Sequence, residues 1–381
     1  MTKDRTLSNL PNTLRDMASE DDAPSDGKQY ARKNGAWTEL APVTGDPLPG
    51  YFAKPVRATP LLIKTGATSV KIPAGLVAAV GTAVVELEAD LSLALDTDLV
   101  SGTAVAGADY FVYLKDDASA YLSASESETE GRLIGGFHYG LTGHAEAATG
   151  NKTEADMVKL RGINSHSFWD LAWRANKQTN RGLTYCEVAG WVDIYLADEL
   201  YAVRGYSAPG GWIAAGAQSN GRKFPVIPEA YGGDGSANYG KLTPFVAWDM
   251  LNSAGMDSIS YQQFSHAMYG VQEGLAASGL ESTIGRIEHY PQLTSRFGIE
   301  QATGTQWIWG ADKGASSSGT WNSHADGRGQ VYSGVVVVLL GASRDLAAGR
   351  PGSRASYWNY GLSNSGWNVG VRGRRDHLIL D

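Results

Sequence analysis

The sequence predicts an α+β fold in which short strands outnumber helices. Short β-prone runs separated by Gly, Pro and Asp fill residues 51–160, and two helical segments with clear start signals follow residue 243. The 47 glycines indicate many turns and loops, and ten of the eleven tryptophans lie after residue 165. An aromatic-rich core therefore begins near that residue. We expect three parts, which span residues 1–48, 49–164 and 165–381.

The first part, residues 1–48, is predicted to contain a β-hairpin. Tyr30, Trp37 and Leu40 flank Asn34-Gly35, a pair that strongly favours a type I′ turn. A single hairpin is not stable alone in water, so we expect this region to pack on copies of itself. The stretch 44–50 is predicted to be a linker.

The second part, residues 49–164, is predicted to be an all-β, sandwich-like domain. Its β-prone runs are separated by turns at a spacing typical of small sandwiches, and they span residues 69–81, 83–96, 109–117 and 132–140. Residues 142–156, TGHAEAATGNKTEAD, are expected to form a loop.

The third part, residues 165–381, is predicted to be α+β. The run 185–196 is either a strand pair or one long strand. Thr243 is expected to cap a helix that has Pro244 at its first position and stops at Gly255.

A second helix is predicted to begin after Ser260. Ser260 and Gln263 have the spacing of a capping box for residues 261–272. The apolar residues of this segment share one face, which consists of Phe264, Ala267, Met268 and Val271. The β-prone runs after this helix are joined by glycine-rich loops.

Composition excludes several classes of protein. Hydrophobic residues make up 43% of the chain and charged residues 19%, so a packed core is expected. The net charge is −8 without a basic block, which argues against a nucleic-acid partner. The longest aliphatic run, residues 335–340, is too short to cross a bilayer, and the N-terminus lacks the apolar core of a signal peptide. We expect a soluble protein that is made in a cytosol and not inserted in a membrane.

No metal or cofactor site is predicted. The seven histidines lack zinc-motif spacing, and there is no phosphate-binding loop. His324-Ala325-Asp326 has the residue types of a metal or catalytic fragment, but a solvated loop is the better interpretation. Asp234 in GGDGS is a conceivable calcium ligand, although a plain flexible loop is the better interpretation there too.

No catalytic centre is predicted either. Cys186 is the single cysteine, so no disulfide can form within the chain. It lies in an apolar strand pattern without a neighbouring basic residue, which is typical of an inert buried thiol. His377 beside Asp376 is expected to make a structural contact near a short buried strand at residues 378–380.

The strongest functional signal is the composition of residues 344–369. Tyr supplies large contact area at low entropic cost, and Ser, Gly and Asn supply adaptable hydrogen bonds, as in antibody loops. Composition alone also fits a glycine-rich surface loop without a partner. The dense part of this segment contains Tyr357, Asn359, Tyr360, Ser363, Asn364, Ser365 and Asn368.

Eight segments from about residue 130 onward resemble the phage major tropism determinant family. They are, in order, GGFHYG, SFWDLAWR, GWVDIYL, GGDGSA, QWIWG, GRGQVY, GSRASYW and GVRGRRDHLILD. The resemblance implies a C-terminal C-type lectin-like domain that lacks disulfides. It also implies two small all-β domains before it, one β-prism-like and one β-sandwich-like. The family is trimeric and lies at the tip of the virion tail fibre, so residues 1–48 would serve trimerisation and virion attachment.

The resemblance also assigns the variable, receptor-binding positions, which a retroelement diversifies mostly at AAY codons. Carried over residue by residue, they are Arg344, Leu346, Ala347, Ala348, Arg350, Tyr357, Asn359, Tyr360, Asn364, Gly366, Asn368 and Val369. A one-residue shift in the first segment would add Asp345. The expected scaffold residues are Arg354, Trp358 and Trp367.

Codon chemistry provides an independent check on this assignment. Substitution of both adenines in an AAC codon gives only codons ending in C, which encode no Lys, Glu, Gln, Met or Trp. Residues 344–369 contain no Lys, Glu, Gln or Met. Their two tryptophans, Trp358 and Trp367, fall outside the assigned variable positions. The pattern supports retroelement diversification of the segment.

The leading hypothesis is therefore a phage tail-fibre receptor-binding protein. Its partners would be a protein or glycan on a bacterial surface, other tail-fibre proteins, and two copies of itself in a homotrimer. The alternative is a diversified adhesion or display protein of the same fold that is not on a virion. An enzyme related to formylglycine-generating proteins is disfavoured, because that chemistry needs a cysteine pair and Cys186 is single.

Overall fold

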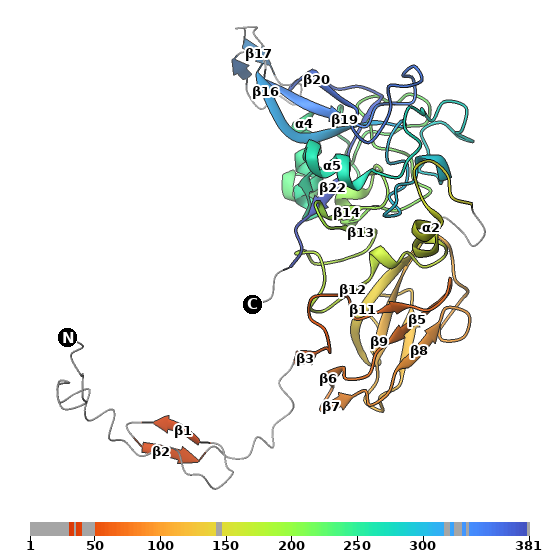
Figure 1. Ribbon diagram of the computed structural model, residues 1–381. Coiled ribbons are helices and arrows are strands. Elements are labelled where there is room, and N and C mark those ends of the chain that lie inside the picture. The colour runs from red at the N-terminus through yellow and green to blue at the C-terminus, as the bar shows by residue number, and fades with distance from the viewer. Residues whose placement is uncertain are drawn as a thin grey trace, which may run out of the picture. The chain divides into compact units, whose positions relative to one another are not determined.

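The computed structural model describes three long stretches of the chain and four short strands outside them. The stretches are residues 50–141, 147–315 and 335–378, and the strands are residues 30–33, 36–39, 321–323 and 330–332. The chain divides into two compact units, Met1–Pro49 and Gly50–Asp381. Figure 1 shows the elements of both units. The mixed α+β architecture predicted from the sequence is confirmed.

The first unit contains the predicted hairpin. β1 (Tyr30–Lys33) pairs antiparallel with β2 (Ala36–Glu39), and Lys33 lies opposite Ala36. This register leaves two residues for the connection, which is the loop length that an Asn-Gly type I′ turn requires. The turn itself and residues 44–49 of the predicted linker lie outside the described residues.

Three sheets follow between residues 50 and 170. Their orders are β3-β6-β7, β4-β5-β8 and β10-β9-β11-β12. They share one buried core that includes Val70, Ile72, Leu93, Val112, Leu122, Ile134 and Phe137. The strands are β3 (Phe52–Ala53), β4 (Ile63–Lys64), β5 (Ser69–Ile72), β6 (Val77–Val80), β7 (Ala83–Glu86), β8 (Leu91–Ala94), β9 (Ala108–Leu114), β10 (Ala120–Ser123), β11 (Arg132–Tyr139) and β12 (Trp169–Asp170).

β12 lies beyond residue 164 in the chain yet belongs to the sheet of β9 and β11. Gly135 is opposite Asp170 in this pairing, and a Cβ on Gly135 would lie only 2.4 Å from the carbonyl oxygen of Trp169. The buried Asp170 carboxylate accepts from Lys54 Nζ and from the Leu61 backbone N–H, both at 2.7 Å. Residues 50–61 are thus hydrogen-bonded to the start of the third part. The domain boundary at residue 164 therefore stays a prediction.

The expectation of a loop throughout residues 142–156 is wrong at its end, because α2 (Glu154–Leu160) begins there. The Thr153 side chain accepts from the Asp156 backbone N–H, and the Asp156 carboxylate accepts from the Thr153 N–H. This reciprocal capping box satisfies two backbone donors that would otherwise lack partners. Met157 and Leu160 then bury one side of the helix.

The helices of the third part begin where their caps predict. Thr243 caps α4 (Pro244–Ser253), and Ser260 and Gln263 form the capping box of α5 (Tyr261–Ala267). α5 ends before residue 272, although its predicted apolar face is fully buried. α5 contacts β16 and β19, as Figure 1 also shows. The remaining helical segments are η2 (Ser165–Ser167), α3 (Tyr201–Arg204), η3 (Glu229–Tyr231) and η4 (Pro291–Leu293).

Two four-stranded sheets and one short strand pair complete the third part. The sheet orders are β13-β14-β22-β15 and β20-β19-β16-β21. β13 and β14 are antiparallel neighbours with Leu183 opposite Asp193, so the run 185–196 contains parts of a strand pair rather than one long strand. The strands are β13 (Leu183–Cys186), β14 (Gly190–Asp193), β15 (Asp257–Ser258), β16 (Trp307–Ala315), β17 (Trp321–Ser323), β18 (Gln330–Tyr332), β19 (Val335–Leu340), β20 (Ser356–Gly361), β21 (Val369–Gly370) and β22 (Gly373–Arg375).

Arg372 attaches the end of the chain to the core. Its guanidinium is fully buried and donates to the carbonyl oxygens of Asp193 (2.7 Å), Ile194 (2.8 Å) and Glu300 (2.6 Å). The Gly373 N–H donates to the Asp193 carboxylate at 2.8 Å. Burial lowers the pKa of Arg372 to about 10, so the side chain stays charged at neutral pH. β22 is therefore held between β14 and β15.

The expected strand at residues 378–380 lies mostly outside the described residues, of which Leu378 is the last. Among the described helices, none has the length and apolar character needed to cross a bilayer.

The Arg372→Met substitution should lower the free energy of unfolding by about 3–5 kcal/mol, because it leaves buried carbonyls without donors. The matched control is Arg375→Gln, three residues further along the chain. Arg375 forms a partly exposed ion pair with Asp257 at 3.1 Å, so its loss should cost less than about 1 kcal/mol. Urea unfolding followed by tryptophan fluorescence measures both values. Equal effects of the two substitutions would contradict the anchoring role of Arg372.

Candidate functional site

The structure brings five of the predicted variable residues together around one groove. The groove has a volume of about 530 Å3 and is called the aromatic groove below. The predicted residues that line it are Leu346, Arg350, Tyr357, Tyr360 and Asn368. Three further lining residues were not predicted as site residues, namely Trp307, Ala355 and Ser356. The groove therefore joins both predicted variable segments to the strand β16.

A bulge in β20 determines which side chains face the groove. Tyr357 pairs with Leu339 and Tyr360 with Val337, so two residues of β20, 358 and 359, lie opposite Val338 alone. Residues three apart on a regular strand point to opposite faces of the sheet. The bulge instead places Tyr357 and Tyr360 together, with ring centroids 5.8 Å apart in an edge-to-face arrangement.

Two tryptophans of β16 support these tyrosines. The ring centroid of Trp307 lies 6.0 Å from that of Tyr357, and the centroid of Trp309 lies 5.8 Å from that of Tyr360. Trp309 is buried and donates its indole N–H to the Leu242 carbonyl at 3.1 Å. The floor of the groove is thus attached to the hydrophobic core.

The pairing of β16 with β21 positions Asn368. Trp307 lies opposite Val369 in this parallel pair, and its backbone N–H donates to the Asn368 carbonyl at 2.9 Å. Gln306 donates its side-chain amide to the Trp367 carbonyl at 3.1 Å. Main-chain hydrogen bonds therefore fix the backbone of Asn368, and its side chain faces the groove.

Glu273 holds the turn between the two segments that are predicted to be variable. Its carboxylate accepts from the Ser353 backbone N–H at 2.8 Å and from the Ser353 hydroxyl at 2.6 Å. The Gly274 N–H donates to the Pro351 carbonyl at 2.8 Å, and the Gly349 N–H donates to the Gly274 carbonyl at 2.9 Å. These bonds fix the backbone on either side of Arg350 without involving its side chain.

Arg344 does not line the groove. Its guanidinium forms an ion pair with Glu281, and its side chain is only 17% exposed. The Glu281 carboxylate also lies near Arg222, whose guanidinium is 5.2 Å from the centre of the Trp367 ring. Arg344 is therefore part of a mostly buried charge cluster beside the predicted surface.

Two assigned residues have an exposure that does not suit their predicted roles. Val369 was assigned to the variable, receptor-binding positions, but it is fully buried because it belongs to β21. Trp358 was assigned to the scaffold, but it is 46% exposed because the bulge turns it away from the groove. There it contacts Tyr261 at a centroid distance of 6.4 Å.

The other predicted residues range from exposed to half-buried. Arg354 is exposed, whereas Trp367 is half-buried against Arg222. Gly366 accepts the Gly216 N–H at 3.0 Å through its carbonyl. Exposed positions outside the groove are Asp345, Ala347, Ala348, Asn359 and Asn364. A binding role for any of the assigned residues stays a prediction.

The alternative chemical sites gain no support from their geometry. The Asp234 carboxylate accepts from the backbone N–H groups of Ser236 and Ala237, both at 2.8 Å, which lowers its pKa to about 2. Burial raises the pKa of the Cys186 thiol, as expected for an inert cysteine. Within the part of the chain that the structure describes, no three His, Cys, Asp or Glu side chains cluster as metal ligands do.

The predictions for the two histidine segments have different outcomes. His377 accepts from the Trp191 indole N–H at 3.1 Å, and its ring lies 4.2 Å from that of Trp173. The predicted structural contact of His377 is therefore confirmed. His324-Ala325-Asp326 lies outside the described residues.

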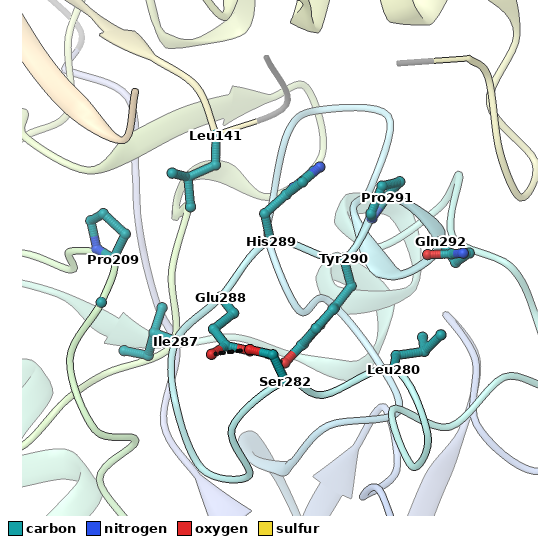
Figure 2. A pocket seen from close by; sticks show the side chains of 11 residues that line it. Leu141, Pro209, Leu280, Ser282, Ile287, Glu288, His289, Tyr290, Pro291 and Gln292 are labelled. Carbon is teal, nitrogen blue, oxygen red and sulfur yellow. Dashed lines mark hydrogen bonds between the residues drawn. The ribbon is translucent and has the colours of Figure 1, made fainter. Parts of the chain in front are cut away.

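A larger cavity of about 730 Å3 lies elsewhere and contains none of the predicted residues. Figure 2 shows that Ser282, Glu288 and Tyr290 converge on its floor. The Glu288 carboxylate accepts from the Ser282 hydroxyl at 2.8 Å and from the Tyr290 hydroxyl at 2.6 Å. Both of its oxygens are thus bonded within the cavity. The aromatic groove is the better candidate site, because it gathers predicted residues from both variable segments.

The Glu273→Ala substitution should loosen the turn that carries Ser353. Loss of the bond to the Ser353 N–H should speed amide hydrogen exchange at this residue roughly fivefold, since one net hydrogen bond is worth about 1 kcal/mol. Glu86→Ala on β7 is the control, because Glu86 is exposed and outside the turn. Exchange rates measured by mass spectrometry test this expectation. Unchanged exchange at Ser353 would show that Glu273 does not hold the turn.

The comparisons with known proteins all find the same kind of relative. The family model described as the Mtd second domain matches residues 60–170. The tail fiber receptor-binding protein of Bordetella phage BPP-1 is 29% identical over 343 residues, which cover 87% of this chain and 85% of that protein. The solved Major Tropism Determinant M1 variant is 30% identical, with a TM-score of 0.77 over 91% of this chain and 90% of that chain. The U1 variant is 29% identical over the same shares, with a TM-score of 0.78.

Proposed function

Because this chain belongs to the major tropism determinant family, we propose that it is a phage tail-fibre receptor-binding protein whose aromatic groove contacts a bacterial surface receptor. The observation that carries the proposal is the groove itself. Side chains from two variable segments meet there, while the backbone beneath them is held by bonds to residues elsewhere in the chain. Such an arrangement lets the surface change without changing the fold.

The proposal also assigns a domain to each of the three parts of the chain. Residues 165–381 would form a C-type lectin-like receptor-binding domain, residues 49–164 a sandwich-like domain, and residues 1–48 a prism-like attachment region. The protein would lie at the tip of the tail fibre among other fibre proteins, and a retroelement would diversify the variable positions. The tail-fibre relative favours this location over a display protein that is not on a virion.

We expect the protein to be a homotrimer. The hairpin of β1 and β2 cannot be stable alone and needs partners, which two further copies would supply. Size exclusion with light scattering should give three times the chain mass of 40.5 kDa. A monomer at micromolar concentration would refute the trimer.

The Tyr357→Ala substitution should weaken adsorption to the receptor-bearing bacteria. Tyr357 is 42% exposed in the groove, so its loss should remove roughly 2 kcal/mol of binding if it is a hot spot and at most about 0.5 kcal/mol of stability. The matched control is Tyr269→Ala, since Tyr269 is similarly exposed at 47% and lies outside the groove.

The measurement is binding of the purified protein to a panel of bacterial strains, with denaturation as a parallel check. Binding should persist in EDTA, because no carboxylate lines the groove. Normal adsorption by Tyr357→Ala together with loss in Tyr269→Ala would place the site elsewhere. Binding that EDTA abolishes and calcium restores would require a metal.

A further inference from the structure

The aromatic groove contains a cation without a counterion. Arg350 is exposed, and among the described residues no acidic side chain forms an ion pair with it. Arg354 is likewise exposed and unpaired within the described part, and it directly precedes Ala355, which lines the groove. Of the nearby acidic groups, Glu281 pairs with Arg344, and the carboxylates of Glu273 and Asp345 bond to Ser353 and Ser343 rather than to Arg350. The two exposed guanidinium groups belong to a chain whose net charge is −8.

The groove is also rich in hydrogen-bond donors. An arginine guanidinium has five N–H donors and no acceptor, and an indole has one donor only. The Ser356 hydroxyl oxygen already accepts from the Trp358 indole N–H at 3.1 Å, which leaves its proton available to donate. No Asp or Glu lines the groove, so its side-chain acceptors are limited to Asn368 and the hydroxyl oxygens of Ser356, Tyr357 and Tyr360. A complementary ligand must therefore bring acceptors and negative charge.

The aromatic floor of the groove favours a second property of the ligand, an apolar side chain. Trp307, Tyr357 and Tyr360 present adjacent rings, and the volume of about 530 Å3 accommodates one large apolar side chain. Aromatic anchors seated in such pockets commonly supply most of the energy of a protein interface.

We propose that the groove binds an acidic protein segment, with a carboxylate on Arg350 and an adjacent aromatic or aliphatic side chain on the ring floor. The proposal rests on the proposed function and specifies the chemistry of the receptor. Peptide carbonyls and carboxylates are acceptors, which suits the donor-rich lining. Polysaccharides carry many hydroxyl donors, and the groove has few acceptors for them. Arg350 thereby becomes a specificity-determining residue.

The test uses the full-length protein and three polymer probes. A random copolymer of glutamate and tyrosine should bind, polyglutamate should bind more weakly, and alginate, an acidic polysaccharide, should not bind. Raising NaCl from about 50 to about 300 mM should weaken copolymer binding severalfold, because the contact is electrostatic and partly exposed. Biolayer interferometry measures all three probes.

Two arginine variants isolate the contribution of the groove. Arg350→Gln should weaken copolymer binding about tenfold. Arg57→Gln should not, since Arg57 is exposed, is unpaired within the described residues and does not line the groove. Failure of the copolymer to bind, preference for alginate, or equal effects of the two variants would each overturn the proposal.

Bacterial adsorption separates this proposal from the proposed function. Loss of adsorption in both Tyr357→Ala and Arg350→Gln supports both. Loss in Tyr357→Ala with normal adsorption in Arg350→Gln retains the groove as the receptor site and overturns the acidic ligand.

Discussion

The rest of the third part depends on the buried guanidinium of Arg372. This single side chain bonds carbonyl groups near residue 193 and near residue 300, which belong to segments more than a hundred residues apart. It closely follows the segment proposed to be variable, so the chain returns to the core just after that segment. A buried charge satisfied by main-chain groups is costly to remove and does not depend on neighbouring side-chain identity. The variable segment is thus fixed at its C-terminal end by a contact that substitutions within it leave intact.

The backbone of the aromatic groove is likewise held by contacts that do not involve the outward-facing side chains. Glu273, Gly274 and the β16 backbone hold the main chain, while the side chains of Arg350 and Tyr357 remain directed outward. The exception is Arg344, whose pairing with Glu281 makes it part of the structure beneath the surface. Positions within one variable segment therefore differ in how freely they can change.

Local signals predicted much of this structure, and long-range pairing accounts for what they missed. The family resemblance, the pairing of residues 30–33 with 36–39 and the caps of α4 and α5 follow from short sequence motifs and are confirmed. The cap of α2 at Thr153 is a local signal of the same kind, which the expected loop at residues 142–156 does not take into account. Glu273 lies 80 residues from Ser353 and has no local signature. The exposure of Trp358 depends on a bulge that is visible only once β20 is aligned with β19.

That bulge makes the pairing of β20 part of the site. Tyr357 and Tyr360 are three residues apart, so regular pairing at the present strand length would send them to opposite faces, whereas removal of one residue between them would leave them two apart and on one face. The extra residue of the bulge is thus what compensates for the odd spacing of the two tyrosines. Replacement of one exposed side chain by another on β20 leaves this backbone pairing in place, so the direction in which positions 357 and 360 point does not depend on which side chains they carry.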